Sequence, residues 1–409
     1  MKQKIARRVN VIYAAMQGSY WLTNMTLTGY VAIFLSGRGL SDTQSGLTIS
    51  LAALGSILLQ TFVSDYSDRH PRVPLKRIIS LFYIAALIAA AGLLWIPSSV
   101  ALVMILYICG ASLINALIGF LNAVSMQLFN IGLPINFGIP RGIGSLCAAL
   151  SGLILGNVVE TSGAEIVLPI FLCFCVLAIV CTLVLPRPDS VAARLQLPVA
   201  STEQPVVPST WKMLKTNKVF DLLLIAIIFT FTGQAIFSSF LIRAVENVGG
   251  NAADLGVCYV INSGCEIPAL FLSGLLLKKF SSRGILTVSF FAFFLRSLLL
   301  AVAPSMPLIY LSCALSIGGL GLFSFASVYF VNDLVAPTEK VRGQALASLC
   351  GMGGISNIIG ASLGGVVIDQ LGVNALLYLF AGFSLIGFLL MGIVASLHNK
   401  KLISISLES

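Results

Sequence analysis

Long apolar runs separated by short polar segments dominate the sequence. Twelve runs are long enough to cross a bilayer as helices, which takes roughly 20 apolar residues each. They cover about residues 10–36, 43–63, 78–96, 100–127, 141–159, 166–185, 218–242, 253–277, 285–303, 307–332, 343–368 and 374–397. The runs are continuous and do not alternate between apolar and polar residues, so they favour α-helices over the strands of a barrel. The pattern predicts an all-α membrane protein with twelve transmembrane helices.

Composition agrees with this interpretation. Of the 409 residues, 58% are hydrophobic and 10% charged, whereas a soluble domain carries roughly 25% charged residues. The net charge of +9 could attract nucleic acid, but no basic stripe with interleaved aromatic residues is present. Lys and Arg also accumulate on the cytoplasmic loops of membrane proteins. We therefore expect a lipid bilayer as the surroundings and no nucleic-acid partner.

The segment Ser64–Arg77 lies between the second and third runs and is dense in charge. Such a cluster cannot lie in lipid, so we expect a loop, and its excess of basic residues places it on the cytoplasmic side. Counting crossings from this loop puts both termini in the cytoplasm. Of the 24 Lys and Arg residues, only Arg38 and Arg243 then fall on the outer side, and only Arg296 lies deep within a predicted span, since Arg141 and Lys218 are at the cytoplasmic edges of theirs.

A proline-rich polar stretch, Pro186–Asn217, divides the chain. It predicts an N-terminal bundle of six helices at residues 1–185, a cytoplasmic linker at 186–217 and a C-terminal bundle of six helices at 218–409. The halves resemble each other locally, since the fifth run opens with Arg141-Gly142 and the eleventh with Arg342-Gly343. Two related halves are typical of secondary transporters.

The residues that usually mark metals, disulfides and cofactors do not form such sites here. All nine cysteines fall inside apolar runs without a CxxC pair, and both histidines, His70 and His398, lie outside the runs. We expect packing cysteines, no metal site and no cofactor. The basic N-terminus precedes an apolar run longer than the roughly 7–15 residues of a signal-peptide core, so it predicts an uncleaved first helix.

Two charges within the runs are the sharpest functional signals. Glu266 lies near the middle of the eighth run and Arg296 lies in the ninth. A charge at the bilayer centre costs about 2.5–3.5 kcal/mol even on the mildest scale, so each side chain needs a polar partner. Glu266 is interpreted as a substrate contact or a proton-carrying carboxylate, and a structural salt bridge with Arg296 is the alternative. Arg296 keeps its proton and needs an anion, which is either Glu266 or an anionic substrate.

Neutral polar side chains recur on other runs and predict a surface that binds a polar solute. Amides and hydroxyls offer directional hydrogen bonds without charge. The alternative is hydrogen bonding between helices, worth about 0.6–1.7 kcal/mol a pair. The candidates are Gln17, Tyr20 and Asn24 in the first run, Gln60 in the second, Asn122 in the fourth, Gln234 in the seventh and Asn262 in the eighth.

The sequence resembles the major facilitator superfamily in its layout and in one motif. The motif reads Ser64-x-x-x-Asp68-Arg69-x-Pro71-Arg72, with Ser64 and Pro71 in place of the two glycines of the family pattern. The resemblance implies transport by alternating access. It also makes Asp68, Arg69 and Arg72 parts of a cytoplasmic gate.

Three segments, Leu40–Gly46, Leu59–Phe62 and Phe137–Ser145, resemble the lactose-permease branch of sugar/proton symporters. That likeness implies that Arg141 and Glu266 contact substrate and that Arg296 belongs to the proton-coupling region. Arg141 could instead be a surface residue that snorkels to the lipid headgroups.

The chain also departs from that branch. Asn122 stands where the branch has a carboxylate, and the tenth-run stretch Cys313–Leu322 carries no charge. A lactose substrate is therefore not implied.

These observations predict a secondary active transporter and not an enzyme. We expect proton-coupled uptake of a small polar solute, such as a sugar or nucleoside, by a monomer in a bacterial cytoplasmic membrane. The alternative is a proton-driven efflux antiporter of amphiphilic compounds. It is less favoured because the fifth run lacks the Gly-Pro pair of such antiporters.

Overall fold

The structure is a computed structural model that describes residues 2–70, 73–95, 99–130, 138–187, 190–191, 218–334 and 339–408. The chain divides into two compact units, Met1–Glu203 and Gln204–Ser409. The division falls inside the predicted linker at 186–217.

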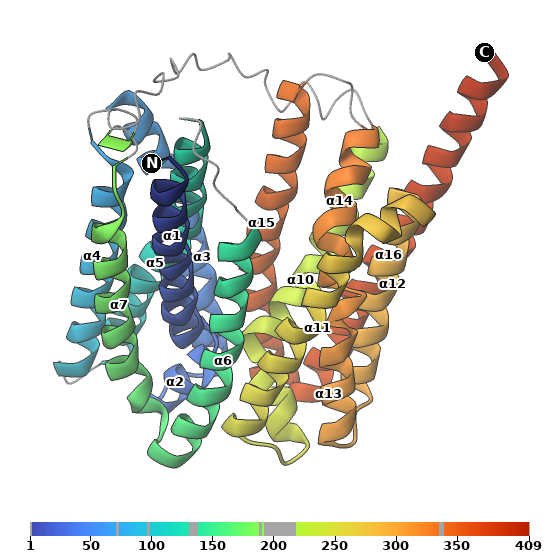
Figure 1. Cartoon of the computed structure of the whole chain (residues 1–409). Coiled ribbons are helices and arrows are strands. Elements are labelled where there is room, and N and C mark those ends of the chain that lie inside the picture. The colour runs from blue at the N-terminus through green and yellow to red at the C-terminus, as the bar shows by residue number, and fades with distance from the viewer. Residues whose placement is uncertain are drawn as a thin grey trace. The chain divides into compact units, whose positions relative to one another are not determined.

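The helices of the first unit are α1 (Lys2–Thr28), α2 (Val31–Gly37), α3 (Asp42–Arg69), α4 (Leu75–Trp95), α5 (Val100–Asn130), α6 (Gly138–Ser162), the 3-10 helix η1 (Ala164–Ile166) and α7 (Val167–Val184) (Figure 1). Those of the second unit are α10 (Lys218–Asn247), α11 (Ala252–Lys279), α12 (Ser282–Ala301), α13 (Met306–Ala314), the 3-10 helix η2 (Leu315–Ile317), α14 (Leu320–Leu334), α15 (Glu339–Leu371) and α16 (Val373–Glu408).

The described residues contain 11 helical segments long and apolar enough to cross a membrane, one for each predicted run after the first. The protein is therefore a multi-pass membrane protein. The first run is different because polar side chains such as Gln17 and Asn24 interrupt its apolar sequence. It forms α1, which ends at Thr28, and the short helix α2, which begins at Val31.

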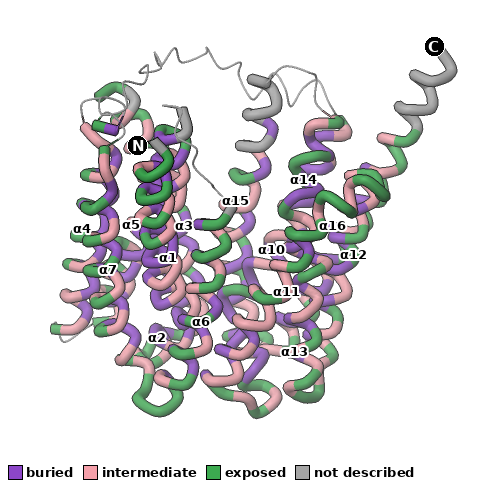
Figure 2. Tube along the Cα trace, viewed as in Figure 1, coloured by how far each residue is buried: buried purple, intermediate pink, exposed green. Residues whose placement is uncertain are grey.

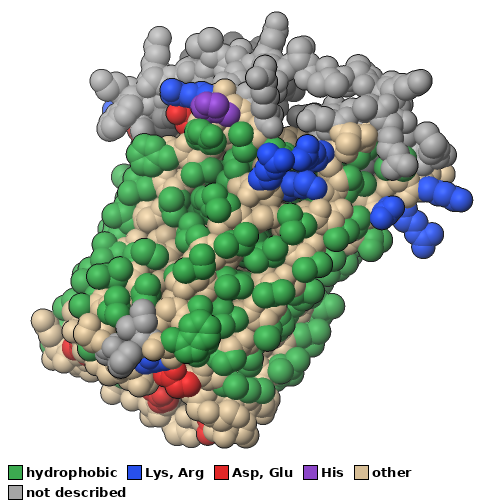
Figure 3. Space-filling view, turned by 90° about the vertical axis from the view of Figure 1, so that its left-hand side faces the viewer, with side chains coloured by type: hydrophobic (Ala, Val, Ile, Leu, Met, Phe, Trp, Pro, Cys, Tyr) green, Lys and Arg blue, Asp and Glu red, His purple; other side chains and the backbone are tan. Residues whose placement is uncertain are grey.

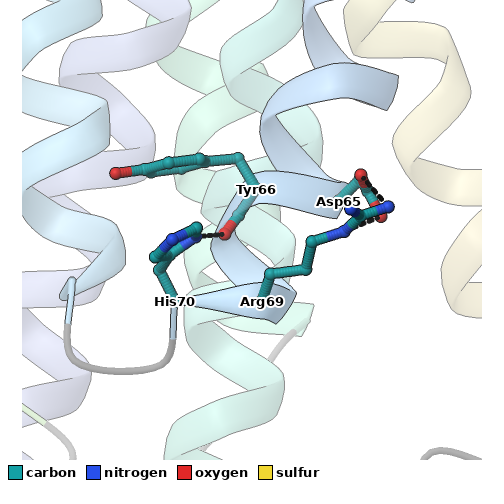
Figure 4. Close-up of polar contacts among 4 residues, drawn as sticks. All are labelled: Asp65, Tyr66, Arg69 and His70. Atoms are coloured by element: carbon teal, nitrogen blue, oxygen red, sulfur yellow. Dashed lines mark hydrogen bonds and ion pairs between the residues drawn. The ribbon is translucent and has the colours of Figure 1, made fainter.

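The prediction that all of Ser64–Arg77 is a loop is wrong. Helix α3 continues through Arg69, where Nη2 lies 2.9 Å from Asp65 Oδ2 one turn earlier (Figure 4). The His70 ring stacks on Tyr66 at 4.4 Å, and its Nδ1 lies 3.0 Å from the Tyr66 carbonyl oxygen. These contacts between residues four apart support the helix beyond the apolar run.

The next helix also includes part of the charged segment. Because α4 begins at Leu75, Lys76 and Arg77 are in its first turn. Of the predicted gate residues, Arg72 and the side chain of Asp68 lie outside the described residues.

The core of the first unit forms where its helices face one another, and buried residues concentrate on these faces (Figure 2). Helix α1 packs against α5, α6 and α7, while α4 packs against α5 and α7. Aromatic residues such as Tyr13, Tyr83 and Phe171 fill this core. Tyr107 also joins two helices, because its hydroxyl donates a 2.7 Å hydrogen bond to the Leu27 carbonyl.

In the second unit α10 packs against α15 and α16, and glycine allows part of this close approach. A Cβ at Gly360 would lie 2.5 Å from the Thr232 carbonyl oxygen, so only glycine allows α15 to approach α10 this closely. By contrast, a Cβ at Gly351 on the same helix would meet nothing within 4 Å. The glycines of α15 therefore differ in what they contribute to packing.

The two units share local features at one end. Each unit has two glycines with a left-handed backbone just after the end of a helix, Gly39 and Gly163 in the first and Gly249 and Gly372 in the second. Gly39 corresponds to Gly249 and Gly163 to Gly372, each about 210 residues apart, as expected for an internal repeat. Next to them, Arg38 pairs with Glu165 and Asn247 hydrogen-bonds Asn374, and both contacts join residues 127 positions apart.

Candidate functional site

Arg296 is at the centre of a polar cluster formed by α10, α11 and α12 in the second unit. It lies on the buried face of α12, and its side chain is fully buried. Helix α12 begins after Ser281, whose hydroxyl accepts a 3.2 Å hydrogen bond from the Gly284 amide as an N-cap. From this start the 3.6-residue period places Ser289, Phe293, Arg296 and Leu300 on one face toward the interior.

The Arg296 guanidinium is held by two amide oxygens and one aromatic ring. Nη1 donates to Gln234 Oε1 at 3.3 Å and Nη2 donates to Asn262 Oδ1 at 2.8 Å. The guanidinium carbon lies 3.7 Å from the centre of the Phe237 ring, a cation–π contact. Gln234 and Phe237 are three residues apart on α10, so one helical face supplies both. The buried charge is thus stabilised by neutral dipoles and a π-face.

Asn262 connects this arginine to the carboxylate. Its Nδ2 donates to Glu266 Oε1 at 3.3 Å, and the two residues are four apart on α11. The Asn262 backbone carbonyl accepts a 2.6 Å hydrogen bond from Ser316 Oγ, which holds that turn of the helix in place. Within the part of the chain that the structure describes, the hydrogen bonds from Arg296 toward Glu266 therefore run through Asn262.

The tenth predicted run is a broken helix at this cluster. Helix α13 ends at Ala314, η2 follows, and α14 starts at Leu320. Hydroxyls at the break bond to backbone carbonyls of the neighbouring helices: Ser312 donates to the Arg296 carbonyl at 3.0 Å, as Ser316 does to Asn262. A Cβ at Gly321 would lie 2.7 Å from Ala269 Cβ and 3.5 Å from Glu266 Cα, so α14 approaches α11 closely beside the carboxylate. The uncharged stretch Cys313–Leu322 thus packs tightly against the cluster.

In the first unit, Arg141 stacks on Trp21. The guanidinium carbon lies 4.3 Å from the centre of the indole ring, and Nη1 is 3.5 Å from Ser145 Oγ. Trp21 reaches this position because a Cβ at Gly144 would lie 2.4 Å from its Cδ1, so glycine leaves room for the ring. Tyr20 meets the same indole edge to face at 5.3 Å. Arg141 is half-buried and packs within the unit, unlike a side chain that snorkels away from it.

The remaining polar candidates of the first unit lie on α1, α3 and α5. Gln17 is buried and donates through Nε2 to the Tyr13 hydroxyl at 2.8 Å. Asn24 Nδ2 donates to Asn115 Oδ1 at 3.0 Å, which ties α1 to α5. Gln17 Oε1 and Asn122 Oδ1 are buried acceptors without a hydrogen-bond partner among the described residues.

Gln60 of α3 packs against α5. A Cβ at Gly119 would lie 1.9 Å from Gln60 Nε2, so the amide occupies the space that a larger side chain would fill. Of the gate candidates, Arg69 pairs with Asp65 on its own helix.

The structure thus brings together all four predicted residues of the second unit: Gln234, Asn262, Glu266 and Arg296. Those of the first unit form separate contacts. Sequence reasoning missed the two aromatic rings that lie against the arginines, Trp21 and Phe237. Each is four or three residues from a predicted polar residue on its helix, Gln17 and Gln234, so helical spacing could have found them.

Comparisons with known proteins agree with this architecture. A family model described as the MFS_1-like family matches residues 20–380. The solved structure of the nucleoside transporter NupG has a TM-score of 0.70 at 16% identity, covering 96% of this chain and 98% of that chain. The structure of a point mutant of NupG has a TM-score of 0.75 at 15% identity, covering 95% of this chain and 99% of that chain.

A third structure is that of a bacterial homolog of the human lysosomal transporter Spinster, in an inward-facing and unoccupied conformation. It has a TM-score of 0.61 at 15% identity, covering 96% of this chain and 95% of that chain. No curated protein sequence matches this chain significantly. At these identities the solved structures show a shared fold and no more.

Proposed function

The chain belongs to the MFS_1-like family, and on that premise we propose that it is a secondary active transporter that carries a small polar solute by alternating access. Nucleosides and sugars are the proposed solute classes, and one structurally similar protein is a nucleoside transporter. The recurrence of local features between the two units supports two related six-helix halves. The excess of basic residues on one side supports cytoplasmic termini in a bacterial cytoplasmic membrane. The narrower likeness to the lactose-permease branch stays a prediction.

The observation that carries the proposal is the connection Arg296–Asn262–Glu266. Glu266 is the group proposed to take up the proton, because it is an ionisable residue in the middle of a membrane helix. Its protonation would weaken the acceptor that orients the Asn262 amide. Since the same amide accepts the 2.8 Å hydrogen bond from Arg296, the change would reach α12 and, through Gln234, α10. A proton on one helix would thereby alter the packing of two others.

Within each unit, polar residues are the proposed solute contacts. A neutral polyhydroxylated solute suits them, because each hydroxyl can donate to one amide oxygen and accept from an amide nitrogen. Gln17 Oε1 and Asn122 Oδ1 are buried acceptors without a hydrogen-bond partner among the described residues, and solute hydroxyls that reach them would satisfy them. The proposed set is Gln17, Tyr20, Asn24, Gln60, Asn122, Arg141, Gln234, Asn262 and Glu266, with Arg296 in the coupling region.

Transport by reconstituted protein tests this proposal. Vesicles with an inwardly directed proton gradient are assayed for uptake of labelled nucleosides and sugars. We expect accumulation by the native protein and loss of proton-driven accumulation in Glu266→Gln, with solute exchange at equal pH retained. Glu160→Gln, the same change on α6, is the matched control. Unchanged proton-driven accumulation in Glu266→Gln would refute the role of Glu266. Export of cationic dyes without nucleoside or sugar uptake would favour the antiporter.

A further inference from the structure

The start of α4 and the end of α7 meet through one lysine. Lys76 Nζ donates to the Leu183 carbonyl at 3.2 Å and to the Leu185 carbonyl at 2.9 Å. The last carbonyls of a helix lack partners within the helix and carry its partial negative charge. Lys76 therefore caps α7 and joins its end to the start of α4, with one of its three N–H groups left for another partner.

Two arginines flank this lysine. Arg77 follows it on α4, Arg187 follows the end of α7, and both are exposed. Arg77 is the residue after Lys76, and Arg187 lies two residues beyond Leu185, whose carbonyl accepts from Lys76, so both positive charges act on its ammonium group. The salt bridges found among the described residues involve other cations, and Asp189, two residues beyond Arg187, lies outside that part of the chain. Three like charges thus gather at one corner of the first unit, an arrangement that an anion would stabilise.

An exposed apolar surface leads away from this corner along both helices. On α4, Arg77 is followed at helical spacing by Leu81, Ile84 and Ile88, which are 62%, 43% and 64% exposed. They form one stripe with the arginine at its head. The side of the molecule on which α4 lies carries a broad hydrophobic face, with Lys and Arg side chains gathered along its upper margin (Figure 3).

Helix α7 supplies the second stripe. Val180, Leu183 and Val184 are 52%, 54% and 54% exposed and lead toward Arg187. Helices α4 and α7 pack against each other, and each carries its stripe on its exposed side. Cations at one end and continuous apolar surface below them match the two parts of a phospholipid.

We propose that the group Lys76, Arg77 and Arg187 binds the headgroup of one anionic phospholipid, whose acyl chains lie along the exposed stripes of α4 and α7. The guanidinium groups fit a phosphate through paired N–H donors. A zwitterionic headgroup would bring its own cation among three others, so a net negative lipid is preferred. The site lies within the first unit and does not depend on the proposed solute or on proton coupling.

The test uses the full-length protein extracted from vesicles of phosphatidylcholine with phosphatidylglycerol, and native mass spectrometry counts the lipids that stay bound. The double variant Arg77→Gln/Arg187→Gln removes two exposed charges and keeps the capping lysine. Lys278→Gln/Lys279→Gln, an exposed pair at the end of α11, removes the same charge elsewhere and is the matched control. At about 1 kcal/mol for each basic residue near an anionic surface, the arginine variant should bind phosphatidylglycerol roughly 30-fold more weakly.

Selective loss of one retained phosphatidylglycerol from the arginine variant, with the control unchanged, supports the proposal. Equal loss of bound phosphatidylglycerol from both variants would show diffuse electrostatic attraction and would overturn the proposal. Retention of the lipid by both variants would also overturn it. Competition by glycerol phosphate as effective as that by phosphatidylglycerol would show a free-anion site and would also overturn it. Thermal unfolding of both variants in detergent confirms that each is folded before the lipids are counted.

Discussion

Replacing Asn262 with alanine disconnects Arg296 from Glu266. The substitution removes the 2.8 Å hydrogen bond to the guanidinium and the 3.3 Å contact to the carboxylate. The hydrogen bond from Ser316 to the backbone carbonyl remains. A hydrogen bond to a charged group contributes about 1.5–3 kcal/mol. Asn262 is half-buried, so water can replace part of the bond, and we expect a loss at the low end, about 1.5–2 kcal/mol. For a unit of roughly 200 residues this lowers Tm by about 3–8 °C.

Thermal unfolding of the purified protein, followed by intrinsic fluorescence, measures this loss. Ser263→Ala is the control, because Ser263 is the next residue of α11 and also half-buried. We expect the control to unfold near the native temperature. In vesicles, Asn262→Ala should carry out solute exchange with a raised KM, since Asn262 is also a proposed solute contact. It should accumulate little solute on a proton gradient even at saturating solute, because protonation of Glu266 no longer reaches Arg296.

A second substitution, Asn262→Asp, separates stability from coupling. It keeps an acceptor for Arg296 and makes that contact an ion pair, but it removes the donor to Glu266 and adds a like charge four residues away. We expect native-like Tm with lost proton-driven accumulation. The reasoning fails if Asn262→Ala matches the native protein in both Tm and accumulation, or if Ser263→Ala loses as much as Asn262→Ala.

Further substitutions test other contacts. Gly360→Ala should lower the free energy of unfolding by about 1–3 kcal/mol, because the added methyl group overpacks against the α10 backbone. Gly351→Ala on the same helix should be neutral or stabilising. Equal unfolding temperatures of the two variants would contradict this. Trp21→Ala should raise the KM for solute by about 2- to 30-fold, because it removes the cation–π contact with Arg141, worth about 0.5–2 kcal/mol. Trp21→Phe should retain most of the affinity. A change in kcat alone would count against this role. Asp68→Asn should slow transport with little change in solute affinity. Asp65→Asn, which breaks the exposed pair with the gate candidate Arg69, should slow transport less.

The transmembrane spans could be predicted from the sequence, because the length of an apolar run depends on sequence alone. The ends of the helices could not be predicted, because charged residues show where the lipid ends and not where a helix ends. The segment Ser64–Arg77 illustrates this. Its charges do lie beyond the apolar run, yet α3 continues through Arg69, supported by the Asp65 pair and the stacking of His70 on Tyr66. The break between α13 and α14 was missed for a related reason, since the stretch Cys313–Leu322 carries no charge that would mark it.

The candidate site was partly predictable. Glu266 and Arg296 stand out because charge inside a membrane helix is costly. Asn262 shares a face with Glu266 through their spacing of four residues. The contacts of Arg296 with Gln234 and Phe237 depend on how α10 packs against α12. No local pattern in the sequence specifies that packing. The sequence therefore predicted the charged groups and both amides, Gln234 and Asn262, while the contacts that join them and Phe237 to Arg296 required the structure.

The charge balance of this network gives the proposed coupling a direction. Arg296 keeps its proton, so the network is neutral when Glu266 is ionised and carries one positive charge when Glu266 is protonated. A net charge inside a membrane protein is costly unless dipoles compensate it. The protonated state therefore has the greater need for additional acceptors near Arg296, and the hydroxyls of a solute can supply them. Proton and solute would then bind best together, which is the requirement for symport. In Glu266→Gln, which fixes the neutral side chain, solute affinity should stay high and become independent of pH. Affinity that falls sharply in this variant would contradict the argument and favour exchange of proton for solute.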